Sequence, residues 1–218
     1  MDRNVLSALV AYVVLLAALE GARRVAHVTE DVTRKLYLAG IATWSVWAVQ
    51  AGQSDSAATV YLWVAALAYL SFRFGWLHAI EDDGPSLGSV FLPLSGALLF
   101  TWFRSESAYI AAAGMLACGF GDSAAALVGR RTGTRKYRMT SSTRSMEGTL
   151  AMFLAGGLVL TPVLAVVGGL GWHQAMAFAL ITSTVAASIE AVSVYSTDNL
   201  TVPIATAATL ATLVHFSQ

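Results

Sequence analysis

The stretch SAYIAAAGMLACGFGDSAAALVGRR, Ser107 to Arg131, joins a long apolar run to a single acid and two terminal arginines. Its first half, through Phe120, has the polarity of a membrane-embedded helix. Asp122 comes next, and the loop that follows, Arg130 to Arg144, holds six of the thirteen basic residues. An acid at the end of an apolar helix beside a basic loop suggests a site for metal and phosphate.

The composition extends this interpretation to the whole chain. Hydrophobic residues make up 56% and charged residues 12%, whereas a soluble domain has about 25% charged residues. We therefore predict an all-α, polytopic membrane bundle without a soluble domain, in which 1–218 form one membrane domain. A spanning helix needs roughly 17 to 25 residues, so flanking polar positions must complete some runs, and we expect about eight helices, within one. The apolar runs are Val5 to Leu19, Leu36 to Ala51, Ala58 to Phe72, Gly88 to Phe103, Ser107 to Gly121, Thr149 to Gly171, Gln174 to Tyr195 and Leu200 to Phe216.

The loops predict the orientation. The first, third and fifth loops hold all the basic residues except Arg3 and Arg104. The positive-inside rule then places the odd-numbered loops in the cytoplasm and both termini outside. In a prokaryotic or archaeal cell this would be the cell membrane. The zero net charge disfavours nucleic acid as a partner, and the single cysteine, Cys118, excludes a disulfide framework or a cysteine metal site.

Acids inside or beside apolar runs are the strongest functional candidates. Asp122 and Glu190 are costly if they face lipid, and Asp198 and Asn199 follow Glu190 by about two helical turns. We expect the three carboxylates to converge on one shallow site at the cytoplasmic surface. Mg²⁺ or another divalent cation is the natural reason to gather them, although one acid could instead accept a proton. Simpler alternatives are a helix end in water for Asp122 and a buried basic partner for Glu190; Asp198 and Asn199 could be only a turn.

The basic loop would supply the opposite charge. Arg130, Lys136 and Arg144 suit a polyphosphate, although such a loop can also be only a topology signal. On the preceding helix, Asp122 and Gly129 lie on one face, where small residues let a nucleotide or a neighbouring helix approach closely.

The sequence RSMEG begins the next predicted helix. Ser145 can cap that helix, Glu147 lies near its positive end, and Gly148 permits close backbone approach. A helix N-terminus is itself an anion site. Because GxxxxGK[ST] is absent, a nucleotide would be held without a Walker-type loop.

Four blocks, GDSAAALVGRRTG, RSMEGTLAMF, IEA and TDNLTVPIA, occur in the order found in a known family. Together they resemble the CTP-dependent membrane lipid-alcohol kinases: dolichol kinase, phytol kinase and the yeast-type diacylglycerol kinase. The catalytic motifs within these blocks, GDSAAALVGRR, RSMEG and DNLTVP with the preceding glutamate, fall within 107–203. The resemblance implies transfer of the γ-phosphoryl group of CTP to the hydroxyl of a membrane lipid. We favour an isoprenoid acceptor, of the polyprenol, dolichol or phytol type.

Upstream, TRKLYLAG resembles the family's Arg-Lys segment, but Leu38 stands where the family usually has a histidine. GPSLGSVFLPLSG, Gly84 to Gly96, resembles its segment entering a central helix. The resemblance places Arg34, Lys35, Asp122 and Gly129 in the CTP-transferase region. The catalytic candidates are Asp122, Glu190, Asp198 and Asn199, of which the three acids are the metal candidates. The nucleotide-binding candidates are Arg34, Lys35, Ser123, Gly129, Arg130, Lys136, Arg144, Ser145, Glu147 and Gly148.

Two other functions remain open at this point. A CTP:phosphatidate cytidylyltransferase uses the same nucleotide, but the PGHGG block associated with those enzymes is absent. An ion-coupled transporter would use the acids as a relay, preferably nearer the middle of the bilayer. The acidic run Glu81 to Asp83 is interpreted as a solvated loop, with a second metal contact as the alternative.

Overall fold

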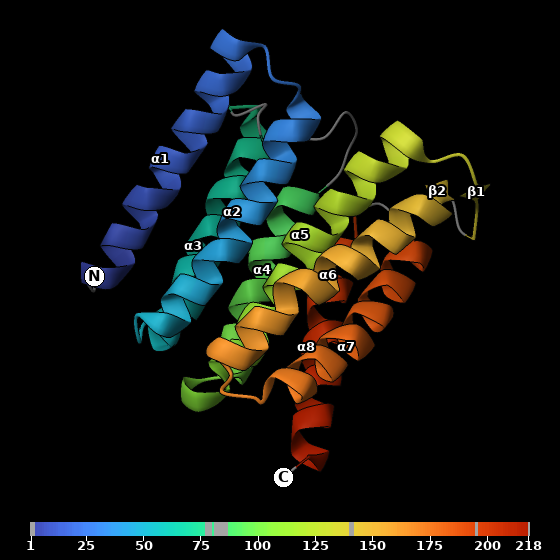
Figure 1. Ribbon diagram of the computed structural model, residues 1–218. Helices are drawn as coiled ribbons and strands as arrows, with labels where there is room; N and C mark the ends of the chain where they lie inside the picture. Colours follow the sequence, from blue (N-terminus) through green and yellow to red (C-terminus); the bar gives the residue numbers. More distant parts are fainter. Residues whose placement is uncertain (1–2, 77–79, 81–86, 140–141, 195, 218) are drawn as a thin grey trace.

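Eight α-helices and a two-stranded hairpin make up the computed structural model, which is described for 3–76, 80, 87–139, 142–194 and 196–217 (Figure 1). The predicted all-α membrane bundle is confirmed. The predicted acidic run Glu81 to Asp83 lies outside the described residues. The elements are α1 (Arg3–Ala26), α2 (Glu30–Gln50), α3 (Ser54–Phe74), α4 (Gly88–Trp102), α5 (Ala108–Thr132), β1 (Lys136–Tyr137), β2 (Arg144–Ser145), α6 (Met146–Val166), α7 (Trp172–Val192) and α8 (Asp198–Phe216), with a 3₁₀ turn at Ser105–Ser107.

Six of these helices, α1, α3, α5, α6, α7 and α8, are long and apolar enough to cross a membrane. The other two deviate for different reasons. Helix α4 has only 15 residues, and α2 carries two acids and two basic residues in its first turns. The buried residues Arg34 and Lys35 lower the mean hydropathy of α2. The helix is therefore less apolar at the end that carries these charges.

Helix α5 is the centre of the bundle. Of its apolar segment 72% is buried inside the protein, against 28% to 39% for the other five spans, and Figure 1 shows it between α2 and α6. Glycines permit this packing. A Cβ on Gly114 would lie 2.5 Å from the Pro203 carbonyl oxygen, and one on Gly119 would lie 2.9 Å from the Leu38 carbonyl oxygen. Contacts this short are possible only where a side chain is absent.

The structure differs from the sequence-based boundaries at the end of α5. The predicted apolar run stops at Gly121, whereas the helix continues to Thr132. The alanine and leucine residues at 124–127 have high helix propensity, so the helix continues past Asp122 beyond the end of the uncharged apolar run. Asp122 therefore lies about 15 Å from the helix end along the axis.

The predicted basic loop contains a short hairpin. Strands β1 and β2 are antiparallel, and Lys136 pairs with Ser145 while Tyr137 pairs with Arg144. Ser145 is also the N-cap of α6, as predicted, because its Oγ accepts a hydrogen bond from the Gly148 N–H at 3.1 Å. The hairpin thereby fixes the basic residues relative to the first turn of α6.

Candidate active site

The three predicted acids come together from three helices at one end of the bundle. Asp122 lies on α5, Glu190 on α7 and Asp198 at the first position of α8. One carboxylate oxygen from each lies within 4.8 Å of the others. Their exposed fractions are 5%, 2% and 6%, so the cluster is buried and the prediction of a shallow site is wrong. Close packing around α5, rather than solvent, surrounds them.

Lys35 neutralises Asp122. Its Nζ forms an ion pair with Asp122 Oδ2, and both side chains are almost fully buried. A charge in this position is tolerated only with a partner, because an unpaired buried ion is strongly destabilising. Lys35 lies in the first turns of α2, so the start of that helix supplies the counter-charge for Asp122.

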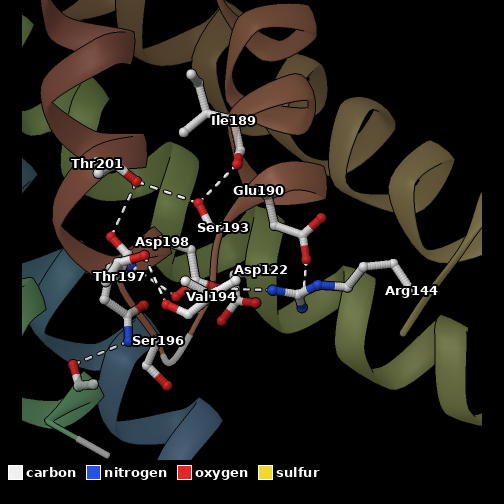
Figure 2. Close-up of polar contacts among 12 residues, drawn as sticks. Asp122, Arg144, Ile189, Glu190, Ser193, Val194, Ser196, Thr197, Asp198 and Thr201 are labelled. Atoms are coloured by element: carbon white, nitrogen blue, oxygen red, sulfur yellow. Dashed lines mark hydrogen bonds and ion pairs between the residues drawn. The ribbon is translucent and has the colours of Figure 1, made fainter. Parts of the chain in front are cut away.

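Arg144 bridges the other two acids (Figure 2). Its Nη1 lies 2.6 Å from Glu190 Oε1, and its Nη2 lies 3.2 Å from Asp198 Oδ2. Burial opposes the charged form of Arg144, but Glu190, Asp198 and Asp122 outweigh it and raise the pKa of the guanidinium above its ordinary value. Glu190 thus has the basic partner that was one of the two interpretations of this acid. The partner is Arg144, which was itself predicted to bind phosphate.

Asn199 ties the cluster to the start of α4. It is fully buried; its Nδ2 donates to the Gly88 carbonyl at 3.0 Å, and its Oδ1 accepts from the Cys118 thiol at 3.3 Å. Arg34 Nη2 donates to Ser196 Oγ at 3.3 Å. A Cβ on Gly88 would lie within 2.9 Å of all three surrounding side chains, those of Arg34, Asn199 and Ser196. The alternative that Asp198 and Asn199 form only a turn is wrong, because both lie in the first turn of α8 and belong to the framework of the site.

A pocket of about 540 Å³ opens beside Arg144. It lies between the last turns of α5, the hairpin and the first turn of α6, and Glu190 contributes to its inner wall. Its size falls in the range of small-molecule sites, roughly 300–1,000 Å³. The lining residues are Ala125, Ala126, Gly129, Arg130, Gly133, Lys136, Thr143, Arg144, Ser145, Gly148, Thr149 and Glu190.

Two glycines shape this pocket by allowing α5 and α6 to approach. A Cβ on Gly129 would lie 2.9 Å from Ser145 Oγ, and a Cβ on Gly148 would lie 2.9 Å from the Ala125 carbonyl oxygen. The first turn of α6 therefore lies against α5 at the pocket, with the small side chain of Ser145 at the approach. The helix dipole at this end favours anions, while the N–H groups of Met146 and Gly148 already donate to the Arg135 carbonyl and to Ser145 Oγ.

The structure does not bring every nucleotide-binding candidate to the pocket. Ser123 donates to the Gly119 carbonyl of its own helix at 2.5 Å. Glu147 instead binds the loop after α5, because its carboxylate accepts hydrogen bonds from Thr134 Oγ1 at 2.7 Å and from the Arg135 N–H at 3.2 Å. Arg130 does line the pocket and is paired with Asp31 at 2.5 Å.

Some contributing residues were missed at the sequence level. Gly88, Thr143, Gly133 and Ser196 carry no ionisable group and act through backbone position or a hydroxyl, so residue type alone gives no signal. Gly88 was within a segment of family resemblance, which was the available hint. Leu38, at the position of the family's histidine, is fully buried and contributes its carbonyl to the close contact with Gly119.

The donor set of the carboxylate cluster fits a hard divalent cation. It offers only oxygens, which Mg²⁺ prefers, and Mg²⁺ is typically held by one or two carboxylates together with substrate phosphates. The neighbouring pocket leaves room for such phosphates. Asp122, Glu190 and Asp198 are therefore the residues able to hold a metal ion.

Comparison with known proteins gives one informative match. The chain is 36% identical over 187 residues to the phytol kinase of Synechocystis sp., a match that covers 81% of this chain and 77% of the relative. Neither a protein-family model nor a solved structure matches. The aligned length and identity extend far beyond the four short blocks. The chain therefore belongs to the family of membrane lipid-alcohol kinases that includes this phytol kinase, and it is an enzyme that phosphorylates an alcohol.

Proposed function

We propose that the protein transfers the γ-phosphoryl group of CTP to the hydroxyl of an isoprenoid alcohol of the phytol type. The observation that carries this proposal is the buried trio of carboxylates that adjoins a basic, glycine-lined pocket. The name of the relative supports the phytol type, and the CTP donor follows from the resemblance of the sequence blocks.

The pocket between α5 and α6 would hold the triphosphate. Arg130, Lys136 and Arg144 line it and supply positive charge. The buried Nε of Arg144 has no hydrogen-bond partner among the described residues, and leaving such a donor unpaired costs about 1–3 kcal/mol. A phosphate oxygen would satisfy it. The positive end of the α6 dipole, at the turn capped by Ser145, adds a further attraction for phosphate.

Asp122, Glu190 and Asp198 would hold Mg²⁺, which, when bound, neutralises charge on the transferring phosphoryl group. Lys35 and Arg144 hold these acids in the structure. When CTP and the metal ion are bound, both cationic side chains would exchange carboxylate partners for phosphate oxygens. The same two residues would thus balance the buried charge in both states.

The chemistry needs little covalent assistance from the protein. The lipid oxygen forms a bond to the γ-phosphorus, the bond from that phosphorus to the β–γ bridging oxygen breaks, and CDP leaves. The hydroxyl proton passes to one of the three carboxylates, which are the only acids of the cluster. Alignment and charge neutralisation by Lys35, Arg144 and the α6 N-terminus would supply most of the rate enhancement.

We propose that this end of the bundle faces the cytoplasm. It gathers Arg34 and Lys35, the hairpin and the connection between α7 and α8. The basic residues at the start of α2 and between α5 and α6 are typical of the cytoplasmic side of a membrane protein.

Labelled nucleotides give the decisive test. Purified protein in lipid bilayers is incubated with Mg²⁺ and phytol, geranylgeraniol, dolichol or diacylglycerol, each with γ-labelled CTP, α-labelled CTP or γ-labelled ATP. We expect γ-label from CTP in phytyl phosphate. Label from the α-position in the lipid would contradict the proposal and favour a cytidylyltransferase. An acid-dependent ion flux without nucleotide would instead favour transport.

A further inference from the structure

A second cavity lies between α1, α2 and α3, and it shares no lining residue with the nucleotide pocket. It has a volume of about 350 Å³. Its walls are alanine, valine, leucine and isoleucine side chains and the rings of Tyr12, Trp44 and Tyr61, with Gly40 in the wall formed by α2. Such a cavity suits a hydrocarbon chain and offers little to a polar ligand.

The polar groups of this cavity are unevenly placed. Thr43 Oγ1 donates to the Ala39 carbonyl at 2.8 Å, and Tyr61 Oη donates to the Ile41 carbonyl at 2.7 Å, so both hydroxyl protons are committed to α2. Tyr12 Oη instead lies 3.4 Å from Tyr37 Oη. The hydroxyl of Tyr12 therefore marks one polar end of an otherwise apolar space.

That polar end leads to the carboxylate cluster. Tyr37 Oη donates to the Ser89 carbonyl at 3.1 Å, and the adjacent Gly88 carbonyl accepts from Asn199 Nδ2 at 3.0 Å. The Asn199 N–H in turn donates to Asp198 Oδ1 at 3.0 Å. These hydrogen bonds, joined through the backbone of Gly88 and Ser89 and through Asn199 itself, lead from the cavity wall across the start of α4 to an acid of the active site.

The position of the cavity along α2 agrees with this direction. Lys35, at the carboxylates, and Gly40 to Trp44, in the cavity wall, belong to the same helix but lie on roughly opposite faces of it, because the helix turns about 100° per residue. Lys35 is directed to α5 and the cavity residues to α1 and α3, so the acceptor would have to pass around α2 by way of α4. At the helical rise, the cavity begins about 8 Å beyond Lys35 and reaches about 14 Å beyond it. A chain whose hydroxyl lies at the acids would extend to this depth.

We propose that the cavity between α1, α2 and α3 holds the hydrocarbon tail of the lipid alcohol, whose hydroxyl reaches the carboxylates past the start of α4. The inference rests on the proposed function and adds the place of the acceptor. Nucleotide and acceptor would then approach the acids from different sides, the nucleotide from α5 and α6 and the lipid from α1 to α4.

Photocrosslinking tests this placement without relying on turnover. The probe is a phytol analogue with a diazirine at the end of its hydrocarbon chain, added to the full chain in nanodiscs and followed by peptide mass spectrometry. We expect crosslinks on the α1 to α3 residues of the cavity that disappear with excess phytol. Competed crosslinks on α5 to α8 would overturn the inference. Crosslinks in α1 to α3 that survive excess phytol would overturn it too, because they would indicate ordinary bilayer lipid.

A filled cavity gives a second, kinetic test. Val64 is buried in the cavity wall, and Val64→Phe should raise the phytol KM about tenfold, the size expected for overpacking. Leu62→Phe is the matched control, because Leu62 lies on the same helix and is 59% exposed; its phytol KM should equal that of the unmodified protein. An unchanged phytol KM in a folded Val64→Phe protein would contradict the inference.

A milder variant covers the case in which Val64→Phe does not fold. A Cβ on Gly40 would lie 3.0 Å from Leu15 Cδ2, so Gly40→Ala should move that flexible side chain into the cavity and raise the phytol KM severalfold. If the protein formed phytyl phosphate but the crosslinks that excess phytol removes lay outside the cavity, the proposed place of the hydrocarbon tail would be refuted and the proposed function would stand. Absence of lipid phosphate with any alcohol, together with no competed crosslinks, would refute the proposed function itself.

Discussion

The nucleotide pocket and the apolar cavity of α1 to α3 are built in opposite ways. The nucleotide pocket lies where α5 and α6 approach closely at Gly129 and Gly148, and charged side chains form part of its lining. The cavity between α1, α2 and α3 forms where packing is incomplete, and its walls are apolar. Helix α1 contributes to it while keeping only 33% of its span buried. The first cavity is therefore specified by particular residues, and the second by the space between helices.

Asp122→Asn should have the largest effect on activity. It removes one of the three clustered charges, and loss of such a group typically lowers kcat about 100- to 1,000-fold. The measurement is initial rate with saturating CTP and phytol. Asp55→Asn is the control, because Asp55 is an exposed acid in the first turn of α3 and should behave as the unmodified protein does.

Folding and catalysis can be separated at this position. Asp122→Asn leaves Lys35 buried without its carboxylate, which costs about 3–5 kcal/mol in comparable cases. The double variant Lys35→Met with Asp122→Asn removes both charges and should recover the melting temperature but no activity. If the double variant recovered both its melting temperature and its activity, the ion pair of Lys35 and Asp122 would be structural. The contrast between a catalytic charged pocket and an apolar cavity would then be wrong.

Arg144→Ala should mainly affect the nucleotide side. Loss of a charge-assisted hydrogen bond of about 1.5–3 kcal/mol corresponds to a rise in CTP KM of roughly 10- to 100-fold. Arg131→Ala is the matched control, since Arg131 is exposed, lies next to the pocket residue Arg130, and does not line the pocket. A larger change in the phytol KM than in the CTP KM would contradict the assignment of the pocket.

Gly148→Ala tests whether close helix approach defines the pocket. The new Cβ would meet the Ala125 backbone oxygen at 2.9 Å, and relieving such overpacking typically costs about 1–3 kcal/mol. We expect a lower melting temperature and a CTP KM several times higher. Gly157→Ala on the same helix is the control, because its Cβ would meet only Leu180 Cδ2 at an ordinary 3.5 Å. Equal effects of both changes would argue against a special approach at Gly148.

The same contrast explains what the sequence could and could not predict. Composition and apolar runs predicted the helical bundle, because burial in lipid imposes length and polarity on each segment. The acids and Arg144 were identifiable because charges in apolar surroundings need partners. The pairing of Arg144 with Glu190 and Asp198 was not, since it depends on the hairpin register that brings β2 to α7. The cavity of α1 to α3 had no motif, because space between helices leaves no pattern in residue types.

Tyr12→Phe should have the smallest effect, and it examines a polar link between the two regions. The change removes the hydroxyl near Tyr37 but keeps the ring in the cavity wall, so a single neutral hydrogen bond of about 0.5–1.5 kcal/mol is lost, equivalent to a twofold to tenfold rise in phytol KM. Tyr69→Phe is the control, because Tyr69 is 49% exposed on α3. The CTP KM should stay unchanged in both variants. A rise in CTP KM for Tyr12→Phe would mean that the polar contacts across α4 serve the acids as a whole, because a residue that acts only on the acceptor has no reason to alter nucleotide binding.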